Sequence, residues 1–137
     1  MSVHYSNQIT PDLDNPLILP FWEACQRHEL VAQHCPSCDT LRFPPLSICA
    51  NCWSENQAWT RIEPFATLWS FVIYRRAMNP AFADEIPYAI GRVKTDAGPV
   101  FETRLAIPLD EIEIGMPLVA SFRDVNADFS LLQFEKR

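Results

Sequence analysis

The sequence predicts a mainly β protein in which a short N-terminal helix and a four-cysteine metal-binding module precede a small five-stranded barrel. Two close Cys-x-x-Cys pairs, helical spacing just before them, and strand-like segments separated by turn signals in the second half lead to this prediction. With 137 residues, 48% of them hydrophobic, the chain suits one domain or two small modules. We expect an N-terminal arm and helix over 1–29, the metal-binding module over 30–62 and the barrel over 63–137.

The N-terminal part divides into an arm and a helix. Residues 1–19 show neither helical nor strand periodicity, so we expect an extended arm. Pro20 stands where the first turn of a helix tolerates proline. Three residues then follow at spacings that share one helical face: Phe21, Cys25 and His28. These patterns predict a helix over about 20–29.

Four cysteines carry the strongest chemical signal, as the pairs Cys35-Pro-Ser-Cys38 and Cys49-Ala-Asn-Cys52. Each pair can wrap one side of an ion, and two such turns complete a tetrahedron of thiolates. A closed four-thiolate shell leaves no open position for water or substrate, so the pattern predicts a structural Zn²⁺. Iron in a rubredoxin-like site, two disulfides and a redox-active pair are the alternatives. Apolar-rich runs over 30–34 and 57–62 predict strands flanking the module.

Two other side chains, Cys25 and His34, could have either a structural role or a reactive or metal-binding one. Cys25 on the helix is expected to be a small buried apolar residue; the alternative is a nucleophile, for which the sequence offers no strong base partner. His34, beside Cys35, is an alternative metal ligand. Because four cysteines are present, we expect His34 to be a neighbour of the site.

From residue 65 onward the pattern is one of strands and turns. Phe65–Arg76 is rich in β-branched and aromatic residues and predicts a long, curved, central strand, followed by a loop over 78–87. Pro108–Glu113 predicts one helical turn. Four more strands are expected in two pairs: Tyr88–Thr95 with Val100–Leu105, and Leu118–Val125 with Ser130–Lys136. Five short strands with an irregular connection after the third favour a barrel of the oligonucleotide/oligosaccharide-binding kind over a seven-stranded sandwich.

Charge argues against several functions. Lys and Arg number 11 against 17 Asp and Glu, a net charge of −6, and the metal-binding half is the more acidic one. Four thiolates around one divalent ion add negative charge, so this surface should repel phosphate. The three glycines are too scattered for a phosphate-binding loop or a dinucleotide fingerprint. We find no Ser-His-Asp set, no His-Glu-x-x-His motif and no second metal cluster, and therefore predict no catalytic residue.

Localisation follows from the absence of targeting signals in the sequence. No run approaches the ~20 apolar residues that span a bilayer. Residues 1–10 lack the basic start and apolar stretch of a signal peptide. Closely paired cysteines are typical of metal ligands in a reducing compartment. We expect a cytoplasmic protein.

Three features suggest binding surfaces. The apolar stretch Phe43–Leu46 favours contact with a protein partner over packing onto the chain's own barrel. Arg75 and Arg76 are candidates for gripping a phosphate of a nucleotide-bearing cofactor; the alternative is surface pairing with acids such as Asp84 and Glu85. Three aromatic residues are candidates for a stacking patch or for the core: Trp69, Phe82 and Tyr88.

The order of these motifs resembles a known family. The pieces are Phe21-Trp22-Glu23, "CPSC…FPPL…CANC", "LWSFVIYRR", "IPYAIGRV" and "EIEIGMPLVASF". They resemble the acyl-CoA-associated proteins that pair a rubredoxin-like zinc ribbon with an OB-fold barrel, known as domain of unknown function thirty-five, over about residues 20–136. The chain has Asp39 and Ala66 where the family often has glycine, and Leu46 where it often has arginine. None of these departures removes a metal ligand.

The resemblance implies a non-catalytic accessory subunit of a thiolase-like acyl-CoA enzyme complex, which carries out acyl transfer or the formation or cleavage of C–C bonds. In such complexes the partner supplies the catalytic residues, and the small subunit stabilises it and helps to form the acyl-CoA channel. The cofactors implied are a structural Zn²⁺ and an acyl-CoA shared with the partner, with Arg75, Arg76, Phe82 and Tyr88 on the acyl-CoA side. The alternatives are a nucleic-acid-binding protein and an independent enzyme that uses Cys25.

Overall fold

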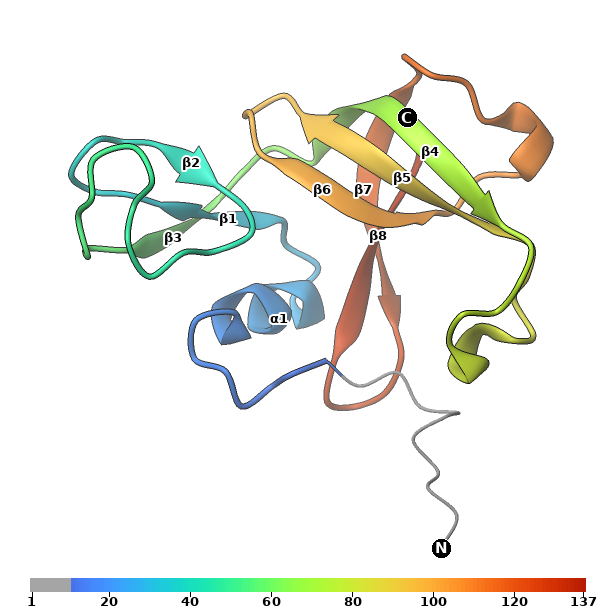
Figure 1. Cartoon of the computed structure of the whole chain (residues 1–137), viewed down its shortest axis with the longest axis horizontal. Helices are drawn as coiled ribbons and strands as arrows, with labels where there is room; N and C mark the ends of the chain where they lie inside the picture. The colour runs from blue at the N-terminus through green and yellow to red at the C-terminus, as the bar shows by residue number, and fades with distance from the viewer. Residues whose placement is uncertain (1–10) are drawn as a thin grey trace, which may run out of the picture.

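The computed structural model describes residues 11–137, and the first ten residues of the predicted arm lie outside it. One helix, a three-stranded sheet and a closed five-stranded barrel follow one another along the chain. In Figure 1 the small sheet and the barrel stand side by side, with the helix α1 (Leu19–Gln26) below their junction. The predicted mainly β architecture is confirmed. The predicted division into 1–29, 30–62 and 63–137 stays a prediction.

Helix α1 is shorter than the predicted 20–29. It ends because His28 has a φ of 59°, a left-handed conformation that commonly terminates helices. His28 therefore lies beyond the helix. The prediction that it shares the apolar face with Phe21 and Cys25 is wrong. Phe21 and Cys25 do share that face, and both are buried. Pro20 occupies the first turn as expected.

The predicted extended arm is wrong in its last residues. The backbone carbonyl of Asn15 accepts hydrogen bonds from the N–H groups of Ile18 and Leu19, at 3.2 and 3.0 Å. These bonds form a turn that leads directly into α1, and Leu19 is already helical. Periodicity could not reveal this segment because a single turn is shorter than one helical repeat.

The small sheet is antiparallel, with the order β2-β1-β3. Strands β1 (Val31–His34) and β3 (Ala58–Arg61) lie within the two predicted runs and confirm them. Strand β2 (Leu41–Arg42) has two residues and was missed, since so short a strand carries no alternation. The sheet thus brings the loops that carry the cysteine pairs to one end of β1.

The barrel closes in the order β4-β5-β6-β8-β7. Its strands are β4 (Phe65–Tyr74), β5 (Tyr88–Thr95), β6 (Val100–Leu105), β7 (Pro117–Asp124) and β8 (Ser130–Lys136). β4 ends two residues before the predicted end, so Arg75 and Arg76 begin the following loop. That loop contains the short 3₁₀ helix η2 (Pro80–Phe82), and η3 (Leu109–Glu111) confirms the predicted helical turn. β6 and β8 pair in parallel over only two residue pairs, so they diverge on one side of the barrel.

Phe101 of β6 connects the three parts of the molecule. Its side chain is 1% exposed, and its ring lies 4.5 Å from that of Phe43 in the cysteine module, centroid to centroid. The ring of Phe43 lies 4.8 Å from that of Phe21 on α1. The preference for a protein partner over self-packing was therefore wrong for Phe43, because the helix and barrel of the same chain cover this ring.

Gly91 in β5 leaves room for a barrel side chain. A Cβ atom at this position would lie 2.6 to 2.9 Å from atoms of the buried Leu105 side chain. We expect Gly91→Ala to lower the free energy of unfolding by about 1–3 kcal/mol, because the barrel must shift to accept the added methyl group. Urea unfolding followed by circular dichroism measures this. Arg92→Ala, next along the strand and exposed, is the control; equal stability of both variants would contradict close packing at Gly91.

Candidate functional site

The two cysteine pairs form turns of nearly equal geometry. The N–H of Asp39 donates to the carbonyl of Cys35 at 2.8 Å, and the N–H of Trp53 donates to the carbonyl of Cys49 at the same distance. Asp39 and Trp53 have φ angles of 65° and 66°, so the residue after each pair is left-handed. Both turns therefore present their thiols in the same way toward a common point.

The four sulfur atoms meet as a metal site requires. The Sγ atoms of Cys35, Cys38, Cys49 and Cys52 all lie within 4.8 Å of one another. The Cys35–Cys52 and Cys38–Cys49 sulfur pairs are 3.6 and 3.7 Å apart. A tetrahedral ion with Zn–S bonds of ~2.3 Å requires sulfur pairs about 3.8 Å apart. The side chains present therefore fit a four-thiolate ion.

Asp39 explains one departure from the family pattern. Glycine adopts a left-handed φ without strain, and Asp is among the few other residues that tolerate it. The carboxylate of Asp39 also contacts Nε2 of His34 at 2.7 Å. His34 is thus a neighbour of the cysteine cluster whose ring is engaged by Asp39.

The cysteine thiols differ widely in pKa. Hydrogen bonds with the side chains of Asn51 and Thr40 lower the pKa of Cys38 to about 5. A backbone hydrogen bond with Ser54 lowers the pKa of Cys52, but burial and the neighbouring cysteine side chains outweigh it and raise that pKa to about 12. Burial raises the pKa of Cys25 to about 12. A thiol held protonated inside the core is a poor nucleophile, which supports the apolar interpretation of Cys25.

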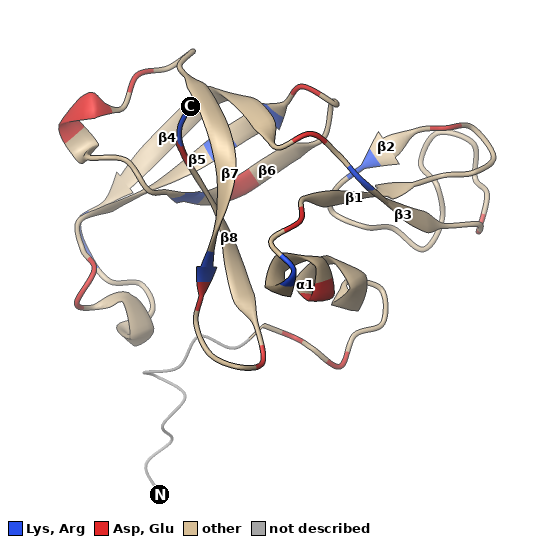
Figure 2. Ribbon diagram, turned by 180° about the vertical axis from the view of Figure 1, so that it is seen from behind, with Lys and Arg blue, Asp and Glu red and all other residues tan. Residues whose placement is uncertain are grey.

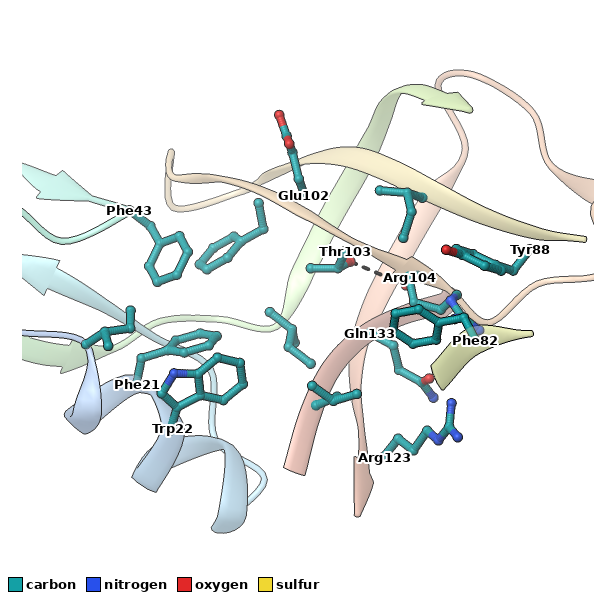
Figure 3. Close-up of a pocket in the computed structure, with 15 residues that line it drawn as sticks. Phe21, Trp22, Phe43, Phe82, Tyr88, Glu102, Thr103, Arg104, Arg123 and Gln133 are labelled. Carbon is teal, nitrogen blue, oxygen red and sulfur yellow. Dashed lines mark hydrogen bonds between the residues drawn. The ribbon is translucent and has the colours of Figure 1, made fainter. Parts of the chain in front are cut away.

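A pocket of about 350 Å³ lies between α1 and the open side of the barrel (Figure 3). Phe82 and Tyr88, two of the candidate cofactor-binding residues, line it, with ring centroids 5.5 Å apart. Arg75 and Arg76 do not line it and are exposed. The structure thus separates the aromatic candidates from the basic ones.

Two other arginines, Arg104 and Arg123, line the pocket. Nη1 of Arg104 and Nη1 of Arg123 both contact Oε1 of Glu85, at 2.9 and 2.6 Å. The predicted pairing of Glu85 with Arg75 or Arg76 is therefore wrong. Burial alone would raise the pKa of Glu85, but hydrogen bonds from Arg123 and Arg104 bring it below its usual value. Sequence reasoning missed both arginines, since each is one charge within a strand and only folding brings it to Glu85.

Of the three aromatic candidates for a stacking patch or for the core, Trp69 belongs to neither. Trp69 does not line the pocket with Phe82 and Tyr88; its ring is 48% exposed and lies under Nζ of Lys94, 5.2 Å from the centroid. Tyr74 extends the patch instead, since its ring stacks 5.3 Å from that of Tyr88.

Part of the cysteine module exposes large apolar side chains. Leu46, Ile48 and Trp53 all belong to the segment between β2 and β3, and their exposed fractions are 39%, 48% and 82%. We call these three residues the ribbon patch. Contiguous exposed apolar side chains are typical of surfaces that contact another macromolecule, and these three belong to one segment of the chain.

Basic residues form no stripe on the described part of the chain. Lys and Arg are spread over several strands, with acidic residues among them (Figure 2). Such a distribution offers no continuous cationic track for a phosphate backbone. Among residues 11–137, no helix is both long and apolar enough to cross a membrane.

Comparison with known proteins gives matches along most of the chain. Residues 22–56 match the family model described as ChsH2, rubredoxin-like zinc ribbon domain, and residues 59–123 match that described as ChsH2, C-terminal OB-fold domain. A protein from Thermomonospora curvata described as a probable enoyl-CoA hydratase alpha subunit is 36% identical over 118 residues. The match covers 83% of this chain, which spans only 36% of that relative's length.

Solved structures agree with these matches. A chain of the structure titled "Ltp2-ChsH2(DUF35) aldolase" superimposes with a TM-score of 0.84 at 30% identity, covering 93% of this chain and 98% of that one. A protein of unknown function of the DUF35 family from Sulfolobus solfataricus shares the fold, with a TM-score of 0.62 at 14% identity, covering 90% of this chain and 87% of that one. The chain therefore belongs to the ChsH2-type DUF35 family, whose members join a rubredoxin-like zinc ribbon to an OB-fold domain.

Proposed function

We propose that this protein is a cytoplasmic, non-catalytic accessory subunit of a thiolase-like acyl-CoA enzyme complex, with a structural Zn²⁺ in its ribbon. The ribbon patch is the observation that carries this proposal, because its exposed apolar side chains suit contact with a protein partner. An ion held by the four clustered cysteines would have no free coordination position, which suits a structural role. Two relatives support it. One solved structure is titled as an aldolase in which Ltp2 is joined to ChsH2, and one relative is described as a subunit of an enoyl-CoA hydratase.

Trp53 is the central residue of this argument. It is 82% exposed although it is a large aromatic side chain, and its left-handed φ costs an L-residue ~1–2 kcal/mol. Neither property stabilises the free chain. Exposed tryptophans that become buried in an interface often dominate binding energy. We therefore infer that Trp53 contacts the partner enzyme.

We expect Trp53→Gly to weaken partner binding without loss of fold. Glycine suits the left-handed φ, so zinc content and melting temperature should stay equal or rise. Loss of a hot-spot side chain, worth ~2 kcal/mol or more, should weaken binding by about thirtyfold. The test is co-expression with the thiolase-like product of a neighbouring reading frame, followed by co-purification and a binding titration.

Met78→Ala is the matched control, since Met78 is a large apolar residue, 75% exposed, in the loop after β4. It should leave partner binding unchanged. Capture of the partner by Trp53→Gly at wild-type strength would contradict the assignment of the ribbon patch. Failure of the wild-type chain to co-purify with the partner, or to raise its activity, would contradict the accessory role itself.

The acyl-CoA contribution is a finer part of the proposal. We propose that Phe82 and Tyr88, on the pocket wall, and Arg75 and Arg76, in the adjacent loop, face the acyl-CoA of the complex. The exposed guanidinium groups suit phosphate, and the aromatic rings suit stacking. Titration of the assembled complex with acyl-CoA, with and without these side chains, tests this part separately.

A further inference from the structure

The geometry points to a binding site for a free amphipathic monocarboxylate in the pocket between α1 and the barrel, with its carboxylate on Arg104 and Arg123. This inference goes beyond the accessory role and does not depend on it. We infer it for the isolated chain, because residues of α1, the cysteine module and the barrel of this chain line the pocket.

The pocket has an apolar end. Phe21 and Trp22 of α1, Phe43 of the cysteine module and Phe101 of β6 face it, as Figure 3 shows for the labelled residues on its left side. It opens here because β6 and β8 pair over only two residue pairs and then diverge. Its volume of about 350 Å³ lies within the ~300–1,000 Å³ of ligand sites. An alkyl or ring system of moderate size would be buried there.

The other end of the pocket carries a surplus of positive charge. Arg104 and Arg123 share the single oxygen Oε1 of Glu85, so two cations face one anion. The guanidinium carbon of Arg104 lies 4.0 Å from the ring centroid of Tyr88 and 5.2 Å from that of Phe82, and these rings hold it in place. A preorganised guanidinium with donors to spare suits a carboxylate.

The remaining acidic residue of the pocket does not cancel this surplus. Glu102 extends away from the pocket in Figure 3, and its carboxylate contacts Nη1 of Arg92 at 3.5 Å. Gln133 adds a neutral amide beside Arg104. One surplus charge beside a mostly apolar wall matches a monoanion with an apolar body, whereas a dianion would stay uncompensated at a partly buried site.

The experiment compares three probes with the same alkyl chain on the full-length, zinc-loaded protein: decanoate, decanol and decyltrimethylammonium, each below its micelle concentration. Calorimetry and the fluorescence of Trp22, which lines the pocket, report binding. We expect decanoate to bind at one site, with an affinity about tenfold or more above that of decanol. This difference in affinity is what one charge-assisted hydrogen bond contributes. Decyltrimethylammonium should bind more weakly than decanol.

Variants distinguish binding that depends on the cationic end of the pocket from nonspecific hydrophobic binding. Arg104→Gln and Arg123→Gln should each remove most of the preference for decanoate and leave decanol binding unchanged. Arg61→Gln removes the same charge at an exposed position outside the pocket and should change nothing. Glu85→Gln should strengthen decanoate binding, because it frees both guanidinium groups. Arg123 is the more exposed of the two arginines, so its variant keeps the test valid if Arg104→Gln misfolds.

Three results would overturn this inference: no decanoate binding, equal affinity for decanoate and decanol, or unchanged decanoate binding in folded Arg123→Gln. Circular dichroism and zinc content establish that each variant is folded. None of these results bears on partner capture, which depends on the ribbon patch.

Discussion

Replacement of Cys38 by serine is expected to release the zinc and unfold the ribbon before it disturbs the barrel. Structural zinc contributes on the order of 10–16 kcal/mol of coupled folding energy in such modules. Besides the contact of Phe43 with α1 and the barrel, the ribbon has only a sheet of three short strands, and its loops expose the ribbon patch. Complex formation should be lost at the same step. Metal analysis, circular dichroism and partner capture on the same sample measure the three effects.

Cys25→Ala is the matched control for thiol loss. Cys25 is buried on α1 and is not among the four clustered cysteines, so the variant should keep its zinc and lose only the stability that belongs to a small core cavity. A Cys38→Ser protein that is free of metal yet melts at the wild-type temperature would contradict a structural metal. Acyl-CoA turnover by the isolated wild-type chain, abolished in Cys25→Ala, would contradict the non-catalytic role.

Phe101→Ala is expected to cost about 3–5 kcal/mol and to uncouple the ribbon and α1 from the barrel. The ring is 1% exposed and contacts Phe43, which in turn contacts Phe21, so one substitution opens a cavity shared by three elements. Urea unfolding measures the loss, and limited proteolysis of residues 43–58 reports release of the ribbon.

Phe134→Ala separates stability from coupling. Phe134 is also fully buried, but it lies in β8 within the barrel. Its loss should lower the free energy of unfolding by a similar amount while the ribbon stays protected from protease. Equal ribbon protection in both variants would contradict the connecting role of Phe101.

Features encoded over a few residues were predictable. The spacing of the cysteine pairs is enough to predict the metal site, because each turn is closed by hydrogen bonds within five residues of the chain. The hairpin Tyr88–Leu105 and the strand Ser130–Lys136 follow from alternation and turn residues alone, and the structure has them at the predicted bounds. The backbone conformation after Cys38 also depends on near neighbours alone, since Asp39 takes the left-handed φ that glycine would favour.

Features that depend on distant residues were not predictable. His28 ends its helix early, and its ring contacts Asp124 of β7 at 2.8 Å. Phe43 is covered because β6 brings Phe101 to it. In each of these contacts, the pattern within one segment carries no information about the other segment. Periodicity therefore assigns residues to helices and strands but does not predict which surfaces contact each other.

By itself the sequence determined the four-thiolate ribbon, the five strands and the absence of a local catalytic motif. The tertiary structure alone decided which charges face the pocket. Glu85 is 19 residues from Arg104 and 38 from Arg123, and barrel closure brings all three together. The physical reason is the separation in sequence between the interacting residues. A metal knuckle is closed by bonds between near neighbours, whereas an ion pair across a barrel forms only after every strand between its members has folded into the barrel.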